Sequence, residues 1–464
     1  MGHFDFARRR RAYGVGTLGL RALGLVALAV VAGCAGHSAR TLDARHALDR
    51  HDPNTALALY NKELEVKSGN ELPKEVKGDN ALLLMDRSTI LQEMSQYANS
   101  SRDLETADKQ VEMLDFTRST AHEIGRYLFS DDTGPYKARP FEKLLINTVN
   151  MLNYLAEGNV NGAKVEARRL AVMQKYLGES QDDPTAQLLG PGSYLAGFVF
   201  ERNGDFDEAV RYYDEALKAT MYTSLAEPLA RLTPYSSYSS PRIKEVTAKV
   251  QAEQPNKEDV DLVVTVNYGR VPALKSVRLP IGLALTASSL YLAPGQEQAA
   301  RRLSGQGLVT WVNYPELEPS PRDYPLPTVM VDGKLAQLDT ITLVDELVRA
   351  AYQKAKGPIL ASAITRLIAR GAAGAAAGVA AGKGSGRSAI GMLVALATEA
   401  TLSAVDTPDT RSWATLPARM TLSRLRLPPG KHTIRVEALG VVREQSIDIP
   451  KGGFAVVNLT ELSQ

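Results

Sequence analysis

The sequence is poor in the side chains on which most enzyme chemistry depends. It contains one cysteine, Cys34, and six histidines in 464 residues. A single cysteine excludes an intrachain disulfide and a thiolate-ligated zinc site. The spacing of the histidines after residue 34 places no two of them on one helical face, so we predict no metal site. These histidines are His37, His46, His51, His122 and His432.

Several catalytic signatures are also missing. The sequence contains no Ser-x-x-Lys, no His-Glu-x-x-His and no Gly-x-Ser-x-Gly, the patterns of penicillin-binding enzymes, zinc peptidases and serine hydrolases. Residues 378–385 resemble a phosphate-binding loop, but a glycine follows Lys383 where Ser or Thr is required. We therefore predict no enzymatic activity and no cofactor. A cell-wall hydrolase using Glu142, Glu157 or Glu166 is the enzymatic alternative.

A strong excess of one charge is absent as well. The formal net charge is +2, and residues 1–33 contribute five arginines and one aspartate, so the remainder carries 2 − 4 = −2. No basic field remains to attract nucleic acid. The hydrophobic content of 44% is ordinary for a globular protein.

The N-terminal residues have the pattern of a bacterial lipoprotein signal. Four arginines at 8–11 precede an uncharged run at 22–33 that ends in small residues before Cys34. The run is shorter than the ~20 residues of a membrane span, although a transmembrane anchor is the alternative. We predict that residues 1–33 are a cleaved signal peptide, that Cys34 is acylated, and that residues 34–45 form a tether. Ala35 favours the outer membrane, with the protein facing the periplasm.

Residues 46–252 have a helical pattern that is similar to tetratricopeptide repeats. The sharpest stretch spans residues 194–217, where a turn at 203–205 separates two helices and an N-cap is expected at Asp205. Gly204 in this turn suits the left-handed conformation that ends a helix. Small and large residues alternate as in such repeats: the turn residue Gly204, the small residues Ala209 and Ala216, and the large residues Phe206 and Tyr213.

A fixed spacing indicates further repeats. An alanine follows a candidate turn residue by five positions four times: His51 and Ala56, Arg102 and Ala107, Gly158 and Ala163, and Gly204 and Ala209. The alanines are 107 − 56 = 51, 163 − 107 = 56 and 209 − 163 = 46 residues apart. We therefore predict divergent repeats that share a continuous core. A helical bundle without repeats is the alternative.

A tyrosine-containing loop and a short helix close this helical region. Tyr222, Tyr235 and Tyr238 lie among serines and threonines in residues 220–240. Tyrosines of this kind can anchor a partner, but we expect them to pack the loop onto its helices. Ser240 and Pro241 then suit the N-cap and first position of the closing helix.

After residue 258 hydrophobic residues recur at every second position, and this alternation predicts strands. Residues 259–344 and 409–464 are read as two parts of one β-sandwich-like domain. A helical hairpin at 345–405 interrupts it. Gly374, Gly378 and Gly382 are four residues apart in the hairpin and permit a close approach of another backbone. We expect the hairpin to pack on its own β-domain; the alternative is that it dips into lipid or joins copies in a homo-oligomer.

Three stretches together support a resemblance: residues 153–169, 409–417 and 427–434. With them, the chain resembles a family of largely uncharacterised tetratricopeptide-repeat lipoproteins of Gram-negative bacteria. The resemblance implies an envelope protein and supplies no catalytic residues. Some members of that family are encoded beside lipoproteins similar to activators of penicillin-binding proteins, which points to cell-wall machinery.

The sequence thus predicts an α+β protein with a TPR-like helical array followed by a β-sandwich-like domain. We expect a non-enzymatic scaffold, attached to the membrane through its N-terminal lipid. The array would bind an envelope protein of the cell-wall or export machinery in its concave groove. The alternative is an oligomeric membrane-active or export component that uses the hairpin at 357–405.

Overall fold

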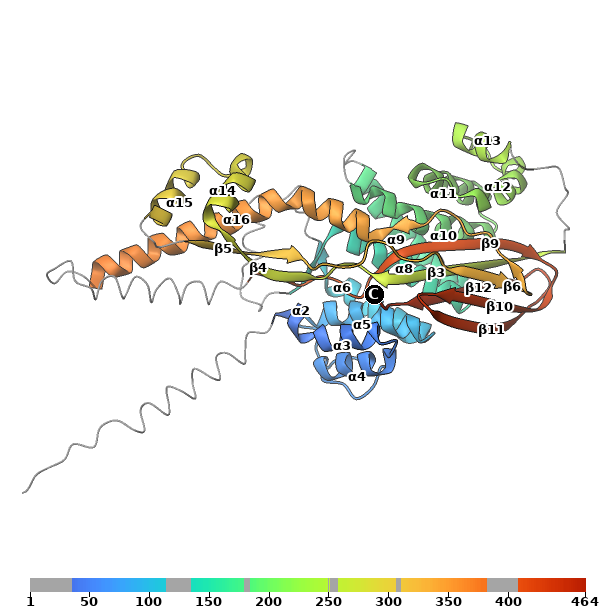
Figure 1. Cartoon of the computed structure of the whole chain (residues 1–464). Coiled ribbons are helices and arrows are strands. Elements are labelled where there is room, and N and C mark those ends of the chain that lie inside the picture. The colour runs from blue at the N-terminus through green and yellow to red at the C-terminus, as the bar shows by residue number, and fades with distance from the viewer. Residues whose placement is uncertain are drawn as a thin grey trace, which may run out of the picture.

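The structure is a computed structural model that describes residues 36–113, 135–178, 184–248, 250, 258–305, 310–381 and 408–464. Helices of the N-terminal half lie beside strands of the C-terminal half, and the long helix α16 runs out to one side (Figure 1). The predicted α+β class is confirmed. No helix among the described residues is long and apolar enough to cross a membrane.

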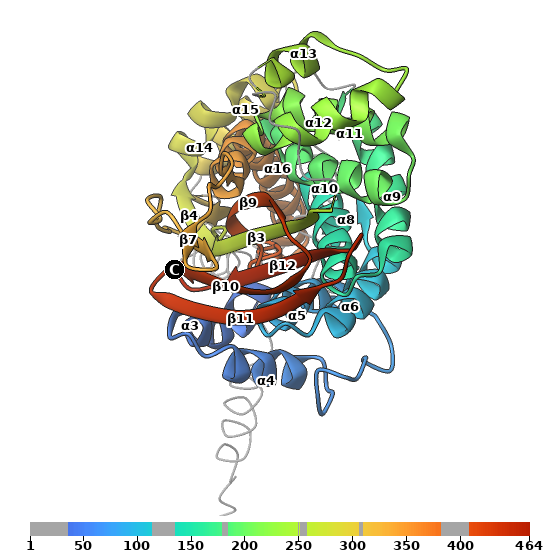
Figure 2. The same cartoon turned by 90° about the vertical axis from the view of Figure 1, so that its right-hand side faces the viewer.

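Eight helices form four consecutive antiparallel pairs that pack side by side. Seen from one end, the array curves around the strands (Figure 2). The pairs are α3 (Leu42–Asp49) with α4 (Pro53–Glu63), α5 (Asn80–Glu93) with α6 (Tyr97–Gln110), α8 (Pro140–Ala156) with α9 (Val160–Gly178), and α10 (Leu189–Arg202) with α11 (Phe206–Ala219). The short α2 (His37–Arg40) precedes them, and α12 (Ala226–Leu232) and α13 (Pro241–Thr247) follow.

The same backbone turn joins the two helices of every pair. The turn residue is His51, Ser95, Gly158 or Gly204, and its φ lies between +55° and +82°. Its N–H bonds to the carbonyl three residues earlier, and the next N–H bonds to the carbonyl five residues earlier. This is the Schellman motif, which satisfies carbonyls that the helix end leaves free.

A small, fully buried residue lies five positions after each turn residue. These residues are Ala56, Ser100, Ala163 and Ala209, and each is 0% exposed. A short side chain here lets the second helix of a pair approach the first closely. Three of the four predicted turn-to-alanine spacings therefore match the structure.

Two sequence predictions are wrong in this region. Arg102 lies inside α6 rather than in a turn, and the turn of that pair is at Ser95, where no glycine marks it. The predicted tether at 34–45 is also wrong from residue 36 onward, because α2 and the first part of α3 pack with buried His37, Thr41 and Arg45. Because the residues that this segment buries are polar, its sequence has no hydrophobic periodicity that would predict a helix.

Two four-stranded sheets share an apolar cluster of buried residues. The first has the order β12 (Phe454–Glu461), β3 (Val260–Arg270), β9 (Pro417–Leu427) and β8 (Thr342–Leu343). The second has the order β11 (Val441–Ile449), β10 (Gly430–Ala438), β6 (Thr328–Val331) and β7 (Lys334–Leu335). A tight hairpin joins Val331 to Lys334, with positive φ at Asp332 and Gly333.

Early and late strands pair with each other, as the sequence predicts. β3 is parallel to β12 and antiparallel to β9. All eleven residues of β3 are buried, because one face packs on the second sheet and the other on the helices. The largest apolar cluster joins residues of α5, α8 and α10 to Val263, Met420 and Val456 of the first sheet. The helical region and this sheet therefore share one core.

A lobe projects from the sheets and is built on a two-stranded ribbon. Its elements are β4 (Leu274–Pro280), β5 (Trp311–Leu317), α14 (Ile281–Ser288), the 3₁₀ turn η4 (Ser289–Tyr291), α15 (Gln296–Gly305) and the outer part of α16 (Val344–Ala381). Helices α14 and α15 lie within a region whose sequence pattern predicts strands. Residues of α16 as far as Leu367 belong to the apolar cluster of this lobe. The expected packing of the first hairpin arm on its own domain is thus confirmed to that point, and residues 382–407 lie outside the described residues.

We predict that Gly197→Ala destabilises the protein by about 1–3 kcal/mol, because overpacking forces neighbours to shift. A Cβ on Gly197 would lie 2.6 Å from Cε1 of Tyr213, whose ring is fully buried. Gly282→Ala is the matched control, since no atom lies within 4 Å of its Cβ position. Urea unfolding of both variants measures the difference; equal stability of the two would contradict this packing.

Candidate functional site

The residues predicted to pack the repeats occupy packed positions, but they form no open site. Ala163, Ala209, Tyr213 and Ala216 are fully buried, Phe206 packs against the core, and Gly158 and Gly204 are turn residues. Gly374 and Gly378 lie on α16. Cys34, the predicted lipid attachment residue, and Gly382 lie outside the described residues.

The concave face of the array is covered by the chain's own first sheet. The cavity between α8, α10, β3 and β9 has a volume of about 20 Å³, which is room for about one water molecule. Polar bonds cross the same boundary: Gln92 on α5 accepts from Thr460 on β12 at 3.1 Å. The prediction that a partner occupies this groove is therefore wrong for the described residues.

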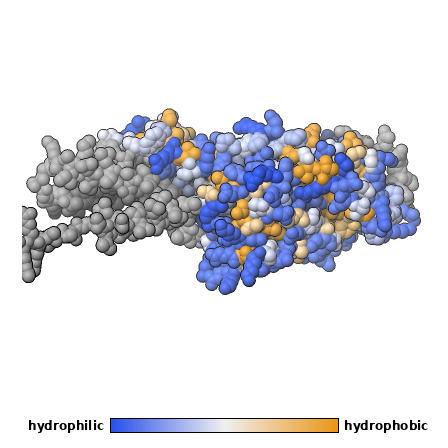
Figure 3. Space-filling view, turned by 60° about the horizontal axis from the view of Figure 1, so that its bottom comes forward, coloured by the Kyte–Doolittle hydropathy of each residue, from blue (hydrophilic) through white to orange (hydrophobic). Residues whose placement is uncertain are grey.

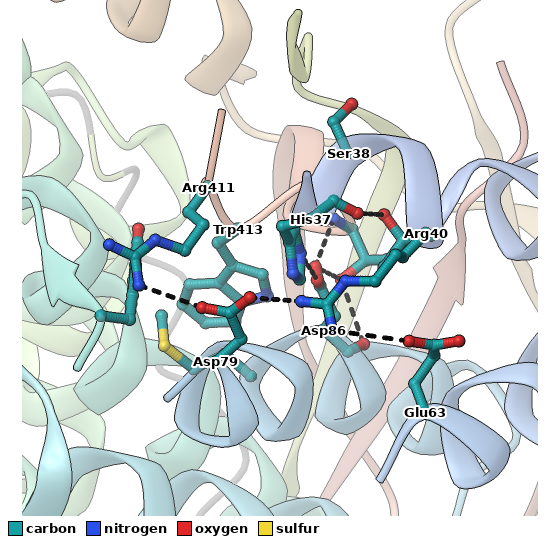
Figure 4. A network of polar contacts seen from close by, with 12 residues as sticks. His37, Ser38, Arg40, Glu63, Asp79, Asp86, Arg411 and Trp413 are labelled. Carbon is teal, nitrogen blue, oxygen red and sulfur yellow. Dashed lines mark hydrogen bonds and ion pairs between the residues drawn. The ribbon is translucent and has the colours of Figure 1, made fainter. Parts of the chain in front are cut away.

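A network of buried polar contacts attaches the first described residues to the body of the protein (Figure 4). The Nε2 atom of His37 lies 3.0 Å from Asp86 Oδ2. Asp86 also accepts from the backbone N–H of Thr415 at 3.1 Å. A few residues on, Arg40 and Arg411 both pair with Asp79, and the Arg411 distance is 3.0 Å. The segment at 36–45 is thereby bonded to Asp79 and Asp86, which in turn bind Arg411 and Thr415.

The same segment contacts the base of the ribbon. Arg45 Nη1 lies 2.6 Å from Glu318 Oε2, and Ser38 donates to Glu318 at 3.4 Å. Glu318 follows β5 directly. Gly36 lies so close to Thr410 that a Cβ would be 3.1 Å from its hydroxyl. The chain is therefore docked from the first residue that the structure describes.

A second buried ion cluster joins α10 to the sheet. Arg424 on β9 lies 2.9 Å from both Glu201 and Asp261. Arg231 pairs with Glu201 at 2.6 Å. Burial alone would raise the pKa of Glu201, but the two guanidiniums outweigh it and lower that pKa to about 2. The cluster stays ionised and fixes the helices against the strands.

Two carboxylates meet where α5 reaches the end of β12. Glu93 and Glu461 are almost fully buried, and Arg443 Nη2 lies 3.6 Å from an oxygen of each. Burial raises the pKa of Glu93 to about 8, and the charge of Glu461 adds to the rise, while Arg443 opposes it. His51 lies 3.0 Å from Glu461. Glu93 is thus protonated in the fold at neutral pH.

Two of the three acids considered for a hydrolase, Glu142 and Glu157, lie too far apart to form a catalytic pair. Glu142 is buried and accepts from Tyr136 at 2.6 Å and from the backbone of Trp413 at 3.1 Å. Glu157 is the C-cap of the same helix, which places it about 20 Å away. Glycosidase carboxyl groups lie roughly 5–10 Å apart. Among the residues that the structure describes, no group of three potential metal ligands comes together.

The tyrosine loop packs as expected at two of its three tyrosines. Tyr222 is 2% exposed, and Tyr238 donates to Asp214 at 2.7 Å. Tyr235 is 73% exposed. Ser240 caps α13 by accepting from the N–H of Ile243, so the predicted N-cap is confirmed.

Comparison with known proteins adds no assignment: no family model matches the chain, and neither a curated protein nor a solved structure matches it.

We predict that Glu93 makes the fold less stable as the pH rises. Its pKa is about 8 in the fold against about 4.5 unfolded, so the folded state holds the proton more tightly. The resulting stabilisation is full below pH 4.5 and is lost as the pH rises through 8. Glu93→Gln should therefore gain on the order of 4 kcal/mol relative to wild type at pH 8 and less than about 1 kcal/mol at pH 5. Thermal unfolding across this range tests it, with the exposed Glu258→Gln as control.

We predict that Asp86→Ala releases the N-terminal segment. The substitution leaves His37 and the Thr415 N–H without their acceptor, at a cost of about 2–4 kcal/mol. Trypsin should then cut at Arg40 and Arg45 much faster than in wild type. Asp43→Ala is the control, because Asp43 is exposed on the same segment. Rapid cleavage of wild type at these arginines would show that the segment is not docked.

Proposed function

We propose that this protein is a non-enzymatic, lipid-anchored scaffold of the bacterial cell envelope. Residues 1–33 would be the signal peptide and Cys34 the acylated residue, and the outer membrane would be its location. The observation that carries the proposal is the docking of residues 36–45, which begins two residues after Cys34. A lipid at Cys34 would hold a rigid body at the bilayer surface, as a scaffold requires.

The helical array supports a role in protein binding. Four helix pairs with one turn geometry and one buried small-residue position are what divergent TPR-like repeats would produce. The two sheets with a shared apolar cluster are consistent with a β-sandwich-like domain. Both assignments are part of the proposal.

A partner would bind the outer surface of the array, since its concave face is occupied. Helix α9 offers a stripe of exposed residues at helical spacing: Asn161, Val165, Arg168, Val172 and Lys175. Val165 and Val172 are 48% and 69% exposed, two turns apart. On the face seen in Figure 3, hydrophilic residues cover much of the described surface and hydrophobic residues form small separate groups. An apolar pair flanked by cations suits a protein partner with an acidic rim.

The anchor is tested by comparing wild type with a Cys34→Ser chain exported by a signal peptide that leaves no lipid. After a high-salt wash, wild type should stay with the outer membrane and require detergent, whereas the variant should be released. The mass of the N-terminal peptide of wild type should include the acyl chains. An unmodified cysteine in that peptide would refute the anchor.

Binding is tested by a photo-crosslinking residue at Val165. We expect one defined envelope protein to crosslink there, and Val172→Asp to abolish that product. A crosslinker at Leu326, which is 76% exposed but lies outside the array, is the control. Identical products at both positions would argue against recognition by α9.

A further inference from the structure

The lobe exposes a group of large apolar side chains on α14, η4 and the start of β5, which we term the tip surface. Its residues are Leu283 (60% exposed), Leu290 (91%), Tyr291 (49%) and Trp311 (49%). Trp311 pairs with Pro280, which α14 follows directly, and Leu290 lies seven residues after Leu283 along α14 and η4. The lobe elements that bear them lie together at one end of the molecule (Figure 1).

The lobe's own core is built from other residues. Ile281, Ala284 and Leu285 on the inner side of α14 are buried with residues of α16. The ring of Tyr291 lies directly over Gly357 of α16, where any Cβ would collide with it. Leu283 and Leu290 therefore lie on a second apolar side of a segment already packed on its first, whereas Tyr291 packs on α16 with about half of its side chain exposed. Solvent-exposed groups of this kind commonly mark interaction sites.

The lobe is also strongly basic. Residues 274–317 and 350–381 contain eight lysines and arginines and two acids, a net charge of 8 − 2 = +6. The remainder of residues 34–464 then carries −2 − 6 = −8. Both acids already face cations: Glu297 pairs with Arg301 at 2.7 Å and Glu316 with Lys356 at 2.8 Å. The exposed cations include Lys275, Arg278, Arg301 and Arg302.

The position of the lobe relative to residue 34 determines whether the tip surface can contact a bilayer that holds Cys34. The docked segment contacts Glu318 at the base of the ribbon. Seven residues of strand span about 23 Å from that base to Trp311. Two residues of chain between Cys34 and Gly36 reach at most about 7 Å. The lobe is thus long enough for the tip surface to reach the surface of a bilayer that holds Cys34.

We propose that the tip surface is a second membrane contact, which binds the surface of a bilayer containing anionic phospholipid. Leucine, tyrosine and tryptophan would enter the headgroup region, and the surrounding cations would attract the lipid phosphates. The identity of the bilayer rests on the proposed lipid anchor, whereas the patch and its charge do not. Attachment at two points would fix the orientation of the protein on the membrane.

The test uses the mature chain with Cys34→Ser, made without residues 1–33, and vesicles of phosphatidylcholine with or without phosphatidylglycerol. Tryptophan fluorescence reports the contact, because the second tryptophan, Trp413, is only 1% exposed. We expect a blue shift and at least about tenfold stronger binding to the anionic vesicles, reduced by salt. Trp311→Phe should remove the shift and leave sedimentation with vesicles largely intact.

Three double variants test whether the tip surface and the nearby cations, rather than any exposed leucine, bind the vesicles. Leu283→Glu with Leu290→Glu should lower vesicle binding at least about tenfold, because it places two anions in the contact. Leu326→Glu with Leu335→Glu changes two equally exposed leucines outside the lobe and should leave binding unchanged. Arg278→Gln with Arg302→Gln should reduce the preference for anionic vesicles.

Three results would overturn the proposal: no binding to either vesicle, equal loss of binding in both leucine variants, or self-association that Leu283→Glu with Leu290→Glu abolishes. The last would assign the surface to a second copy of the chain. Because this protein carries no lipid, its failure to bind vesicles leaves the anchor at Cys34 intact. Conversely, an unmodified Cys34 in cells would refute the anchor without affecting the vesicle result.

Discussion

Burial of both faces of strand β3 is the constraint on which the rest of the structure depends. The residues of β3 alternate between two environments. Leu262, Val264 and Val266 face the second sheet within an apolar cluster. The opposite face carries Asp261, Thr265 and Asn267, which are also buried, toward the helices. Each of these polar groups needs a partner, and the partners come from distant parts of the chain: Arg424 for Asp261, and Asn458 for the other two.

These partners make the register of the sheet specific. A slip of β3 by one residue would move Asp261 into the apolar cluster and Leu262 toward Arg424. The buried ion pairs are weak evidence for net stability, because desolvation offsets the attraction between charges. Their removal one at a time is costly, however, since the remaining charge stays buried. We therefore interpret the Arg424 cluster as the group of contacts that selects one arrangement of the helices on the strands. Asp79 and Asp86 have the same role for the N-terminal segment, whose position they fix.

The sequence revealed local geometry better than it revealed which surfaces meet. Gly158 and Gly204 could be read as turns because glycine adopts a positive φ without strain. Ser95 has a similar positive φ, but serine gives no such signal, so the spacing pattern places the second turn wrongly at Arg102. Strands with one apolar face were found by their period. Helix α14 gives no helical period because it is short and apolar on two sides. The segment at 36–45 has the pattern of a tether because it docks through the polar side chains of His37, Ser38 and Arg45. No pattern in the sequence predicts that the first sheet of the chain packs into the concave face of the helical array.

The filled groove and the docked segment together change how a lipid-anchored repeat protein would work. A flexible tether lets a domain sample many orientations and distances from the bilayer. A segment held by buried polar contacts would remove that freedom, so the direction in which α9 faces would be set by the proposed contact of the lobe with the membrane. Because Arg45 and Glu318 join the segment to the ribbon that bears the tip surface, the anchor and the lobe would move as one body. Contact of the lobe with lipid would then determine which helices of the array remain accessible to another envelope protein.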